Sequence, residues 1–375
     1  MKVSRMFSST IKGASHQSPS LPSSFTLQTN LRNSISLKLK QSWFAGKRNL
    51  CAMSASSSGN ELFDPSFKGA ESFFRSVLAS METVYINRNP TAKAVLELVR
   101  SADDGDEVCY DHIAFRTFGV KGHGIGSIAS FFLDYGYTPQ DELFFPAKKL
   151  KALWFSPPNI PQPSGGGGIN GPLPRIFISE LLVDQMSSHA QKWFFQEIIG
   201  EYIEVSGSSY KHAALASALG SLTWKKPLYS EFQQLARESE YAAWTLVNGY
   251  AVNHVTISAH RLKSHLRSIK NLNQFIEERG FQLNSEGGVL KVSPDGFLLQ
   301  SSTVADSISF QFFDGVIESV PCSYIEFAER LVLPQYKNLP EKEVKEFHRR
   351  DGFEVGNADK IFESTSKEQL TRRAA

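Results

Sequence analysis

Two histidines and one glutamate have the residue types and the surroundings of metal ligands. His112 and His254 each lie in a run of aromatic and β-branched residues that is typical of a buried strand, and Glu326 lies in the apolar run Ser-Tyr-Ile-Glu-Phe. Two neutral imidazoles and one carboxylate leave a divalent iron with up to three open positions on one face, enough for a bidentate 2-oxo acid and O2. Zinc more often completes a tetrahedron. The residues therefore predict a non-haem Fe(II) centre.

Arg116 follows His112 at a spacing that places both side chains on one face of an extended strand. The separation corresponds to about 13 Å along the strand, and the long arginine side chain can reach back toward the metal. A planar guanidinium binds a carboxylate through two hydrogen bonds. Arg116 is therefore expected to hold the far carboxylate of a short 2-oxo diacid whose near end chelates the iron.

Other interpretations of these residues stay open. A histidine in an apolar strand is more often a hydrogen-bonded core residue than a ligand. Glu180 ends the late strand of the first half, which makes it a candidate counterpart of Glu326. A fourth ligand from Glu180 would suit a glyoxalase-like isomerase or lyase, and a protein that only binds metabolites is a further alternative. We favour a Glu180 that points outward or caps a helix.

The remaining candidate clusters have simpler interpretations. His123 lies in a Lys-Gly-His-Gly loop and is predicted to be exposed. The acidic run at 103–107 lacks the ligand spacing of a calcium loop. The glycine run at 165–168 lacks the Lys-Ser/Thr of a phosphate loop and predicts a flexible surface loop. Five histidines in helical or polar stretches are interpreted as surface residues: His189, His212, His260, His265 and His348.

Two stretches of the chain share one order of elements, which positions the candidate ligands. The first contains a strand, a helix and three strands: 108–118, 124–134, 141–145, 149–156 and 175–180. The second contains a strand, a helix, three strands and the segment with Glu326: 252–258, 262–278, 289–292, 297–301, 307–313 and 321–327. Two such βαβββ modules form a curled, mostly antiparallel sheet around a metal site. This predicts an α+β fold with the vicinal-oxygen-chelate architecture.

Helical patterns occupy the stretch at 61–100 and an insert between the modules. We expect a transit peptide at 1–58, a single catalytic domain at 59–365 and a disordered tail at 366–375. The domain would contain the first module, the helical insert, the second module and a C-terminal segment, in this order: about 105–183, 185–242, 248–333 and 334–365.

The first 60 residues have the composition of an organelle transit peptide. They contain no Asp or Glu, Ser recurs throughout, and eight residues are basic. A nucleic-acid-binding arm would more often cluster its basic residues in blocks. A plastid is favoured over a mitochondrion because Ser is abundant and Arg is sparse. Cleavage is expected near 51–58, which would leave a soluble mature protein in the plastid stroma.

The mature chain has an acidic balance. Without the eight basic residues, 32 Lys and Arg stand against 38 Asp and Glu, a net charge of about −6, which disfavours a nucleic-acid partner. No apolar run is long enough to predict a membrane-spanning helix. Only three cysteines are present, and Cys51 would leave with the leader, so a disulfide framework is not expected. The expected partners are small molecules, a 2-oxo diacid and O2.

Four segments together resemble the 2-oxoadipate dioxygenase/decarboxylase family, also called hydroxyglutarate synthases. They are Asp-His-Ile-Ala-Phe-Arg-Thr-Phe ending at Phe118, Val-Asn-His-Val-Thr ending at Thr256, Tyr-Ile-Glu-Phe ending at Phe327, and the tail from Asp351 to Phe362. The resemblance extends over roughly 61–365. The leader makes the plant chloroplast branch of the family the most similar.

The resemblance implies Fe(II) bound by His112, His254 and Glu326, where the substrate also binds, with Arg116 as a further substrate contact. It implies a reaction of 2-oxoadipate with O2 that gives 2-hydroxyglutarate and CO2 in lysine breakdown. The tail resembles the stretch in which family members offer backbone donors to the substrate, although its length and residue types depart from the bacterial pattern. It implies contacts from three residues: Gly356, Asn357 and Ala358.

Overall fold

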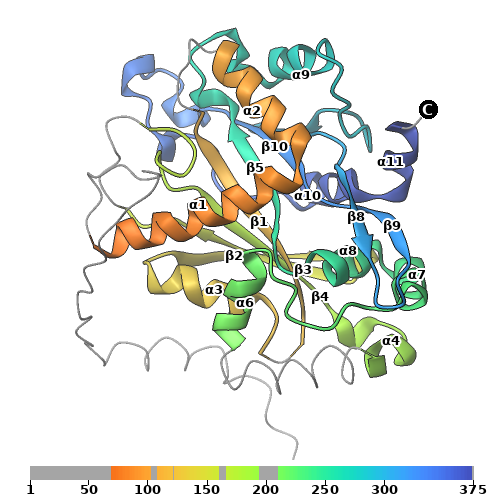
Figure 1. The fold of residues 1–375 in the computed structure, drawn as a ribbon. Helices are drawn as coiled ribbons and strands as arrows, with labels where there is room; N and C mark the ends of the chain where they lie inside the picture. Colours follow the sequence, from red (N-terminus) through yellow and green to blue (C-terminus); the bar gives the residue numbers. More distant parts are fainter. Residues whose placement is uncertain (1–68, 103–107, 121, 160–165, 194–209, 374–375) are drawn as a thin grey trace, which may run out of the picture. The chain divides into compact units, whose positions relative to one another are not determined.

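The computed structural model describes residues 69–102, 108–120, 122–159, 166–193 and 210–373 (Figure 1). The predicted leader and the acidic run at 103–107 lie outside these residues, as do Gly165 and part of the helical insert. The central element of the described chain is a sheet of eight strands in the order β2-β3-β4-β1-β5-β10-β7-β6.

Both predicted βαβββ modules are present in this sheet. The first consists of β1 (Tyr110–Phe118), α3 (Ile125–Asp134), β2 (Thr138–Phe145), β3 (Leu150–Ser156) and β4 (Arg175–Leu181). The second consists of β5 (Val252–Ser258), α9 (Ile269–Glu277), β6 (Lys291–Val292), β7 (Leu298–Ser302) and β10 (Tyr324–Arg330). Within each module the first and last strands pair in parallel, and the other neighbours are antiparallel. The predicted fold class is therefore confirmed.

The modules meet where β1 pairs with β5, and the register is symmetric about this seam. His112 lies opposite Thr256, and Ala114 lies opposite His254. Because alternate residues of a strand face opposite sides, these four side chains share the inner, concave face of the sheet. The intervening residues, such as Phe115, face outward and pack under helices; the Phe115 ring lies 5.8 Å from Phe132 of α3.

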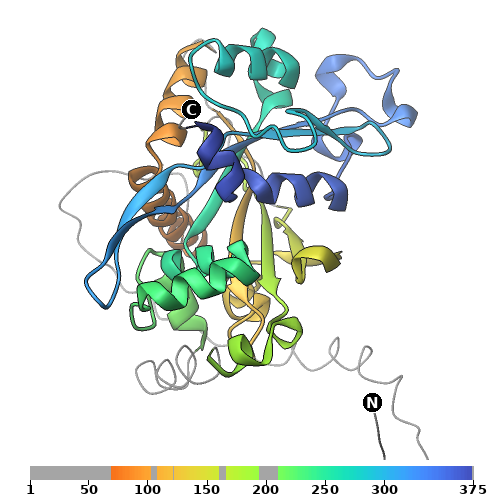
Figure 2. The ribbon, with the colours of Figure 1, turned by 90° about the vertical axis from the view of Figure 1, so that its right-hand side faces the viewer.

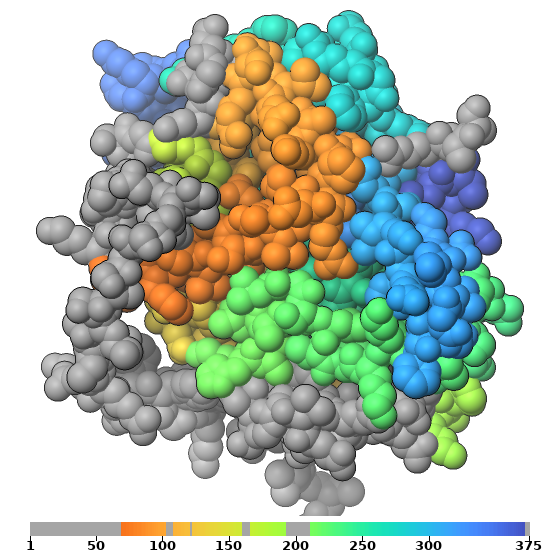
Figure 3. Space-filling view, viewed as in Figure 1, coloured from red at the N-terminus to blue at the C-terminus, as the bar shows by residue number. Residues whose placement is uncertain are grey.

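Helices α1 (Ala70–Arg88) and α2 (Pro90–Ala102) cover the outer face, against β5 and β10 (Figures 1 and 3). The predicted helical stretch at 61–100 is thus two helices where the structure describes it. The break falls at Asn89, because Pro90 has no backbone N–H to continue the helix. The Asp306 carboxylate accepts hydrogen bonds from the Thr91 backbone N–H and hydroxyl, at 2.8 and 2.7 Å, and so caps α2.

The insert between the modules contains α4 (Ser188–Trp193), α6 (Tyr210–Ala218), α7 (Tyr229–Glu238) and α8 (Glu240–Asn248). Helix α8 is buried from Tyr241 to Asn248 and packs on β1. The predicted strand at 307–313 is one arm of a separate hairpin, formed by β8 (Ser307–Gln311) and β9 (Ile317–Pro321). Within the described residues, no helix is both long and apolar enough to cross a membrane.

The C-terminal segment follows β10 and lies across the inner face through α10 (Val355–Ile361) and α11 (Lys367–Arg373). In Figure 2 this dark blue segment and the orange helices α1 and α2 flank the sheet on different sides. The tail is helical over α11, not disordered as predicted. The reason is burial: Leu370 packs against Tyr324, and Gln369 accepts a hydrogen bond from the Ser285 backbone N–H at 3.2 Å.

Candidate metal centre

The three predicted ligands converge on the inner face of the sheet. The Nε2 atoms of His112 and His254 lie 3.3 Å apart, and Glu326 Oε2 lies 3.1 Å from His254 Nε2 and 3.6 Å from His112 Nε2. All three side chains are buried. Ligand atoms that share one divalent ion at about 2.1 Å lie about 3 Å apart, so the three atoms have the spacing of a coordination shell.

Strand register explains this convergence. His112, Thr256 and Glu326 lie side by side in one row across β1, β5 and β10, and His254 lies in the next row, opposite Ala114. Ala114 and Thr256 separate the larger ligands, and the Thr256 Oγ1 lies 3.0 Å from the His112 Nε2. The duplicated order of elements therefore brings together residues that are up to 214 positions apart in the sequence.

Each imidazole is oriented by the residue that precedes it. The His112 Nδ1 lies 2.8 Å from Asp111 Oδ1, and the His254 Nδ1 lies 3.0 Å from Asn253 Oδ1. A ring that donates from Nδ1 directs the lone pair of its Nε2 to the opposite side. Both Nε2 lone pairs therefore face the centre, as in metal sites where a carboxylate or amide oxygen fixes the ligand tautomer.

The charges at the centre favour the metal-binding forms of two ligands. Burial would raise the pKa of Glu326, but the adjacent imidazoles of His112 and His254 lower it to about 2. Burial lowers the pKa of His254 to about 4. At neutral pH Glu326 is thus an anion and His254 is neutral. Two imidazoles and one carboxylate form a donor set that fits a divalent transition metal.

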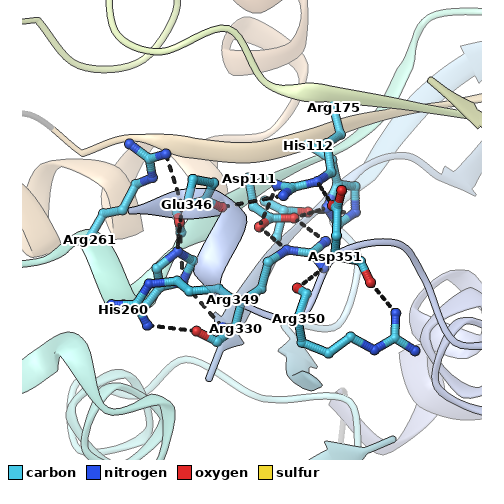
Figure 4. A network of polar contacts seen from close by, with 12 residues as sticks. Asp111, His112, Arg175, His260, Arg261, Arg330, Glu346, Arg349, Arg350 and Asp351 are labelled. Atoms are coloured by element: carbon cyan, nitrogen blue, oxygen red, sulfur yellow. Dashed lines mark hydrogen bonds and ion pairs between the residues drawn. The ribbon is translucent and has the colours of Figure 1, made fainter. Parts of the chain in front are cut away.

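A buried ion pair lies behind His112 (Figure 4). Arg330 Nε and Nη2 bind the two oxygens of Asp111 at 2.6 and 2.9 Å, and Arg175 Nη1 lies 3.4 Å from Asp111 Oδ2. Burial would raise the pKa of Asp111, but the Arg330 and Arg175 guanidinium groups lower it well below its ordinary value. Asp111 is therefore an ionised acceptor for His112. This role of Asp111 was not predicted from the sequence; the feature that could have indicated it is the position of Asp111 directly before His112.

Glu326 has a corresponding partner that the sequence analysis missed. Gln300 Nε2 donates to Glu326 Oε1 at 2.7 Å, which leaves Oε2 for the two imidazoles. Asn357 Nδ2 in turn donates to Gln300 Oε1 at 3.0 Å. The structure thus connects Asn357 to the centre through Gln300. Gly356 is exposed, and the Ala358 N–H donates to the Glu354 carbonyl at 3.0 Å.

Glu180 lies away from the centre, and the interpretation as a helix cap is confirmed. Its Oε2 accepts a hydrogen bond from the Ile125 N–H at the start of α3, at 2.7 Å. Glu329 does the same in the second module, where its Oε2 accepts from the Ile269 N–H of α9 at 2.8 Å. The cap also explains why α9 begins at Ile269 instead of residue 262. The counterpart of Glu180 is therefore Glu329.

The inner-face position that corresponds to Glu326 is occupied by Phe177. Glu326 lies opposite Thr256, and Phe177 lies opposite Ala114, the symmetric residue of the first module. The proposed correspondence between Glu180 and Glu326 was therefore wrong. An aromatic ring cannot bind a metal as a carboxylate does, so the candidate centre offers three side chains as ligands among the described residues.

Alanine at Glu180 tests this assignment. We expect Glu180→Ala to lower the free energy of unfolding by about 1 kcal/mol, the usual effect of losing a helix cap, and to leave bound metal unchanged. The measurements are urea denaturation and metal content of the purified protein. Glu329→Ala is the matched control, because it removes the equivalent cap. A loss of metal in the Glu180 variant alone would restore the four-ligand interpretation.

Arg116 lies buried near the end of β1, among aromatic rings. Its Cζ lies 5.0, 4.9 and 5.7 Å from the ring centroids of Tyr241, Trp244 and Phe362. Its Nη1 donates to Thr365 Oγ1 at 3.1 Å, and its Nη2 donates to the Phe362 carbonyl at 3.4 Å. Among the described residues its guanidinium forms no ion pair, and its Nε has no hydrogen-bond partner. The Glu363 carboxylate acts on the guanidinium through its charge without a direct ion pair. A buried guanidinium without an ion pair favours binding of an anion.

A cavity of about 210 Å³ opens against Arg116. Tyr241, Phe362 and Thr365 line it together with Lys148 of the turn between β2 and β3. The other charged residues of the lining are Lys149, Glu238, Glu240 and Glu363. Lys148 Nζ lies 3.1 Å from Asp359 Oδ1 and 2.8 Å from Glu363 Oε1. These ion pairs tie the turn to the C-terminal segment where the cavity reaches Arg116.

Two histidines differ from their predicted exposure. His123 is buried, and its carbonyl accepts a hydrogen bond from the Tyr250 hydroxyl at 2.6 Å. The His260 side chain is 4% exposed, and its Nε2 lies 3.3 Å from Glu346 Oε2. The sequence around each histidine is polar. Their burial comes from contacts with residues that are distant in the sequence, such as Tyr250 and Glu346. The predictions of surface positions for His123 and His260 were wrong.

Known proteins share this chain's sequence over most of its length. A family model described as 2-oxoadipate dioxygenase/decarboxylase matches residues 77–345. The chloroplastic 2-oxoadipate dioxygenase/decarboxylase of Arabidopsis thaliana is 71% identical over 335 residues, 88% of this chain and 89% of the relative. The chloroplastic/amyloplastic enzyme of Oryza sativa subsp. japonica is 65% identical over 329 residues, 88% of each chain. These locations confirm the predicted plastid location.

A solved structure extends the similarity to the fold. The hydroxyglutarate synthase from Oryza sativa, crystallised in complex with 2-oxoadipate, matches with a TM-score of 0.77 and 66% sequence identity. The match covers 85% of this chain and 100% of that one. Both the family match and the high identity over most of each chain lead to the same assignment. The chain belongs to the 2-oxoadipate dioxygenase/decarboxylase family.

Proposed function

We propose that this chain is an Fe(II)-dependent dioxygenase that converts 2-oxoadipate and O2 to 2-hydroxyglutarate and CO2, as a step of lysine breakdown in the plastid. The observation that carries the proposal is the convergence of His112, His254 and Glu326 near the buried guanidinium of Arg116, which forms no ion pair with the described residues. Membership of the family and the 2-oxoadipate bound to the rice relative support the choice of substrate.

In this proposal His112, His254 and Glu326 hold the iron, which when bound would chelate the 2-oxo acid and activate O2. Arg116 holds the far carboxylate through charge-assisted hydrogen bonds. Gly356, Asn357 and Ala358 are the proposed backbone contacts. Gly356 and Asn357 lie in the first turn of α10, where helix N–H groups lack intrahelical acceptors. The Ala358 N–H donates to the Glu354 carbonyl, so this hydrogen bond would have to break before Ala358 could donate to the substrate.

Aromatic rings separate the centre from water. Phe353 of the C-terminal segment lies edge-on to His112, with ring centroids 4.8 Å apart, and Tyr324 stacks on His254 at 4.7 Å. A dry site strengthens the interactions of the carboxylates with Arg116 and the ligands. Over the whole reaction one oxygen atom of O2 enters the new carboxylate, the other enters the hydroxyl group, and the original carboxyl carbon leaves as CO2.

The alternative, a glyoxalase-like isomerase on the same scaffold, has less support. A fourth carboxylate ligand would be expected at the symmetric position, which Phe177 occupies. Glu180 is engaged at α3 by its hydrogen bond to Ile125.

Oxygen consumption tests the proposed function. The mature chain, loaded with Fe(II) under argon, is expected to consume O2 and release CO2 in a one-to-one ratio when 2-oxoadipate is added to an aerated assay. An oxygen electrode and a carbon dioxide assay measure the two gases, and the metal-free chain is the control. A chain that binds the metal and transforms 2-oxoadipate without consuming O2 would favour the isomerase.

A further inference from the structure

Tyr324 lies between the metal ligands and Arg116. Its backbone is paired beside His254 on the inner face, and its ring stacks on the His254 imidazole with an angle of 25° between the planes. The Arg116 guanidinium is also close, because its side chain contacts the Tyr324 phenol oxygen. One rigid side chain thus spans from a candidate metal ligand to the candidate carboxylate-binding residue.

Two buried donors remain unsatisfied here. Within the described part of the chain, the Arg116 Nε has no hydrogen-bond partner. The Tyr324 oxygen contacts the Arg116 guanidinium, which can only donate, so the phenol O–H has no acceptor. Arg116 is 1% exposed and Tyr324 is 0% exposed, so water is not an easy substitute. Buried polar groups are nearly always paired, because an unpaired one is unfavourable. Since an N–H and a phenol O–H both donate, the group that fits both is an acceptor such as a carboxylate.

We propose that the Tyr324 hydroxyl and Arg116 together bind the far carboxylate of the substrate, so that Tyr324 makes the site select a 2-oxo diacid over a monoacid of equal length. The inference rests on the proposed function, because it concerns the substrate of the same centre. It adds a specificity-determining residue to Arg116.

The surroundings keep both groups in place, and no ion pair to Arg116 forms among the described residues. The Tyr85 hydroxyl donates to the Tyr324 backbone carbonyl at 2.6 Å, which fixes the start of β10. The rings of Tyr241 and Trp244 stabilise the Arg116 guanidinium through their faces and provide no negative charge. The guanidinium charge and the phenol donor therefore both stay available to a ligand. The fixed distance from Tyr324 to His254 would also set how far the two ends of the substrate can be apart.

The test is Tyr324→Phe, which keeps the stacked ring and removes only the hydroxyl group. The probes are 2-oxoadipate and 2-oxohexanoate, which has a methyl group in place of the far carboxylate. Their dissociation constants are measured by calorimetry on protein loaded with Mn²⁺ under argon. We expect the variant to bind 2-oxoadipate roughly 10- to 100-fold more weakly and 2-oxohexanoate as before, since only the diacid loses a charge-assisted hydrogen bond.

Tyr250→Phe is the matched control. Tyr250 is also buried, but its hydroxyl donates to the His123 carbonyl at 2.6 Å, and its loss is expected to change neither dissociation constant. If wild-type protein prefers the diacid and Tyr324→Phe keeps that preference in full, the role of Tyr324 is refuted and the proposed function stands. If Tyr324→Phe weakens both ligands equally, the hydroxyl acts only on the structure, and the inference fails. If wild-type protein does not distinguish the two acids, the proposed substrate itself is wrong.

Discussion

Replacing His254 with alanine is expected to abolish metal binding and oxygen consumption together. His254 Nε2 lies 3.3 Å from His112 Nε2 and 3.1 Å from Glu326 Oε2, so its loss leaves two of three ligands. Removal of a group that merely orients a ligand typically lowers metal affinity by about 10- to 100-fold, and loss of a ligand should exceed this range. The measurements are a metal titration and the oxygen electrode with 2-oxoadipate.

Two further variants are expected to lose less metal affinity than His254→Ala. Asn253→Ala removes the oxygen that orients His254, so we expect an intermediate loss of metal affinity of about 10- to 100-fold. His265→Ala removes an exposed histidine and should behave as wild type. Full metal content and full oxygen consumption in His254→Ala would refute the assigned ligand set.

Replacing Arg330 with methionine is expected to have the largest effect on stability. Arg330 is fully buried and binds both oxygens of Asp111, while its Nη1 donates to the carbonyls of Arg350 and Gly352 at 3.1 and 2.8 Å. The variant leaves the Asp111 carboxylate buried without its main partner. Removing one partner of a buried pair costs about 3 to 5 kcal/mol of unfolding free energy. Urea denaturation measures this change.

The same variant should also weaken the metal centre, because Asp111 orients His112. We expect metal affinity of the folded fraction to fall by about 10- to 100-fold. Arg267→Met is the matched control: Arg267 and Glu341 form an exposed ion pair at 2.5 Å, and such pairs contribute at most about 1 kcal/mol. If Arg330→Met is no less stable than Arg267→Met, the buried pair does not stabilise the fold as argued.

The convergence of His112, His254 and Glu326 could be predicted because their sequence signals are local and repeated. Each histidine lies in an apolar strand, where the two-residue period alone assigns its face. The same order of elements then places His112 and His254 on symmetric strands, and Glu326 lies in an apolar segment where a charged side chain needs a partner. None of these steps required knowledge of contacts between distant residues.

The residue of the second module that corresponds to Glu180 could not be predicted, because the correspondence depends on the pairing register of the strands. The modules share an order of elements but little residue identity, so a shift of three positions along the late strand is invisible in the sequence. Only the pairing of β4 with β1 and of β10 with β5 shows that Glu180 corresponds to Glu329.

The residues around the ligands were missed for a similar reason. Gln300 contacts Glu326 across 26 positions of the chain, and Arg330 contacts Asp111 across 219 positions. No neighbouring residue in the sequence indicates these contacts. Burial of Arg116 by Phe362 and Thr365 likewise depends on a C-terminal segment that crosses the inner face. Such long-range contacts come from tertiary packing, which local patterns of hydrophobicity do not contain.

Labelled oxygen tests the central claim most directly. The Fe(II)-loaded chain is incubated with 2-oxoadipate under ¹⁸O₂, and the five-carbon product is analysed by mass spectrometry. The account predicts 2-hydroxyglutarate with one labelled atom in its new carboxylate and one in its hydroxyl group. A product without label in the new carboxylate, or an isomer that retains all six carbons, would contradict it.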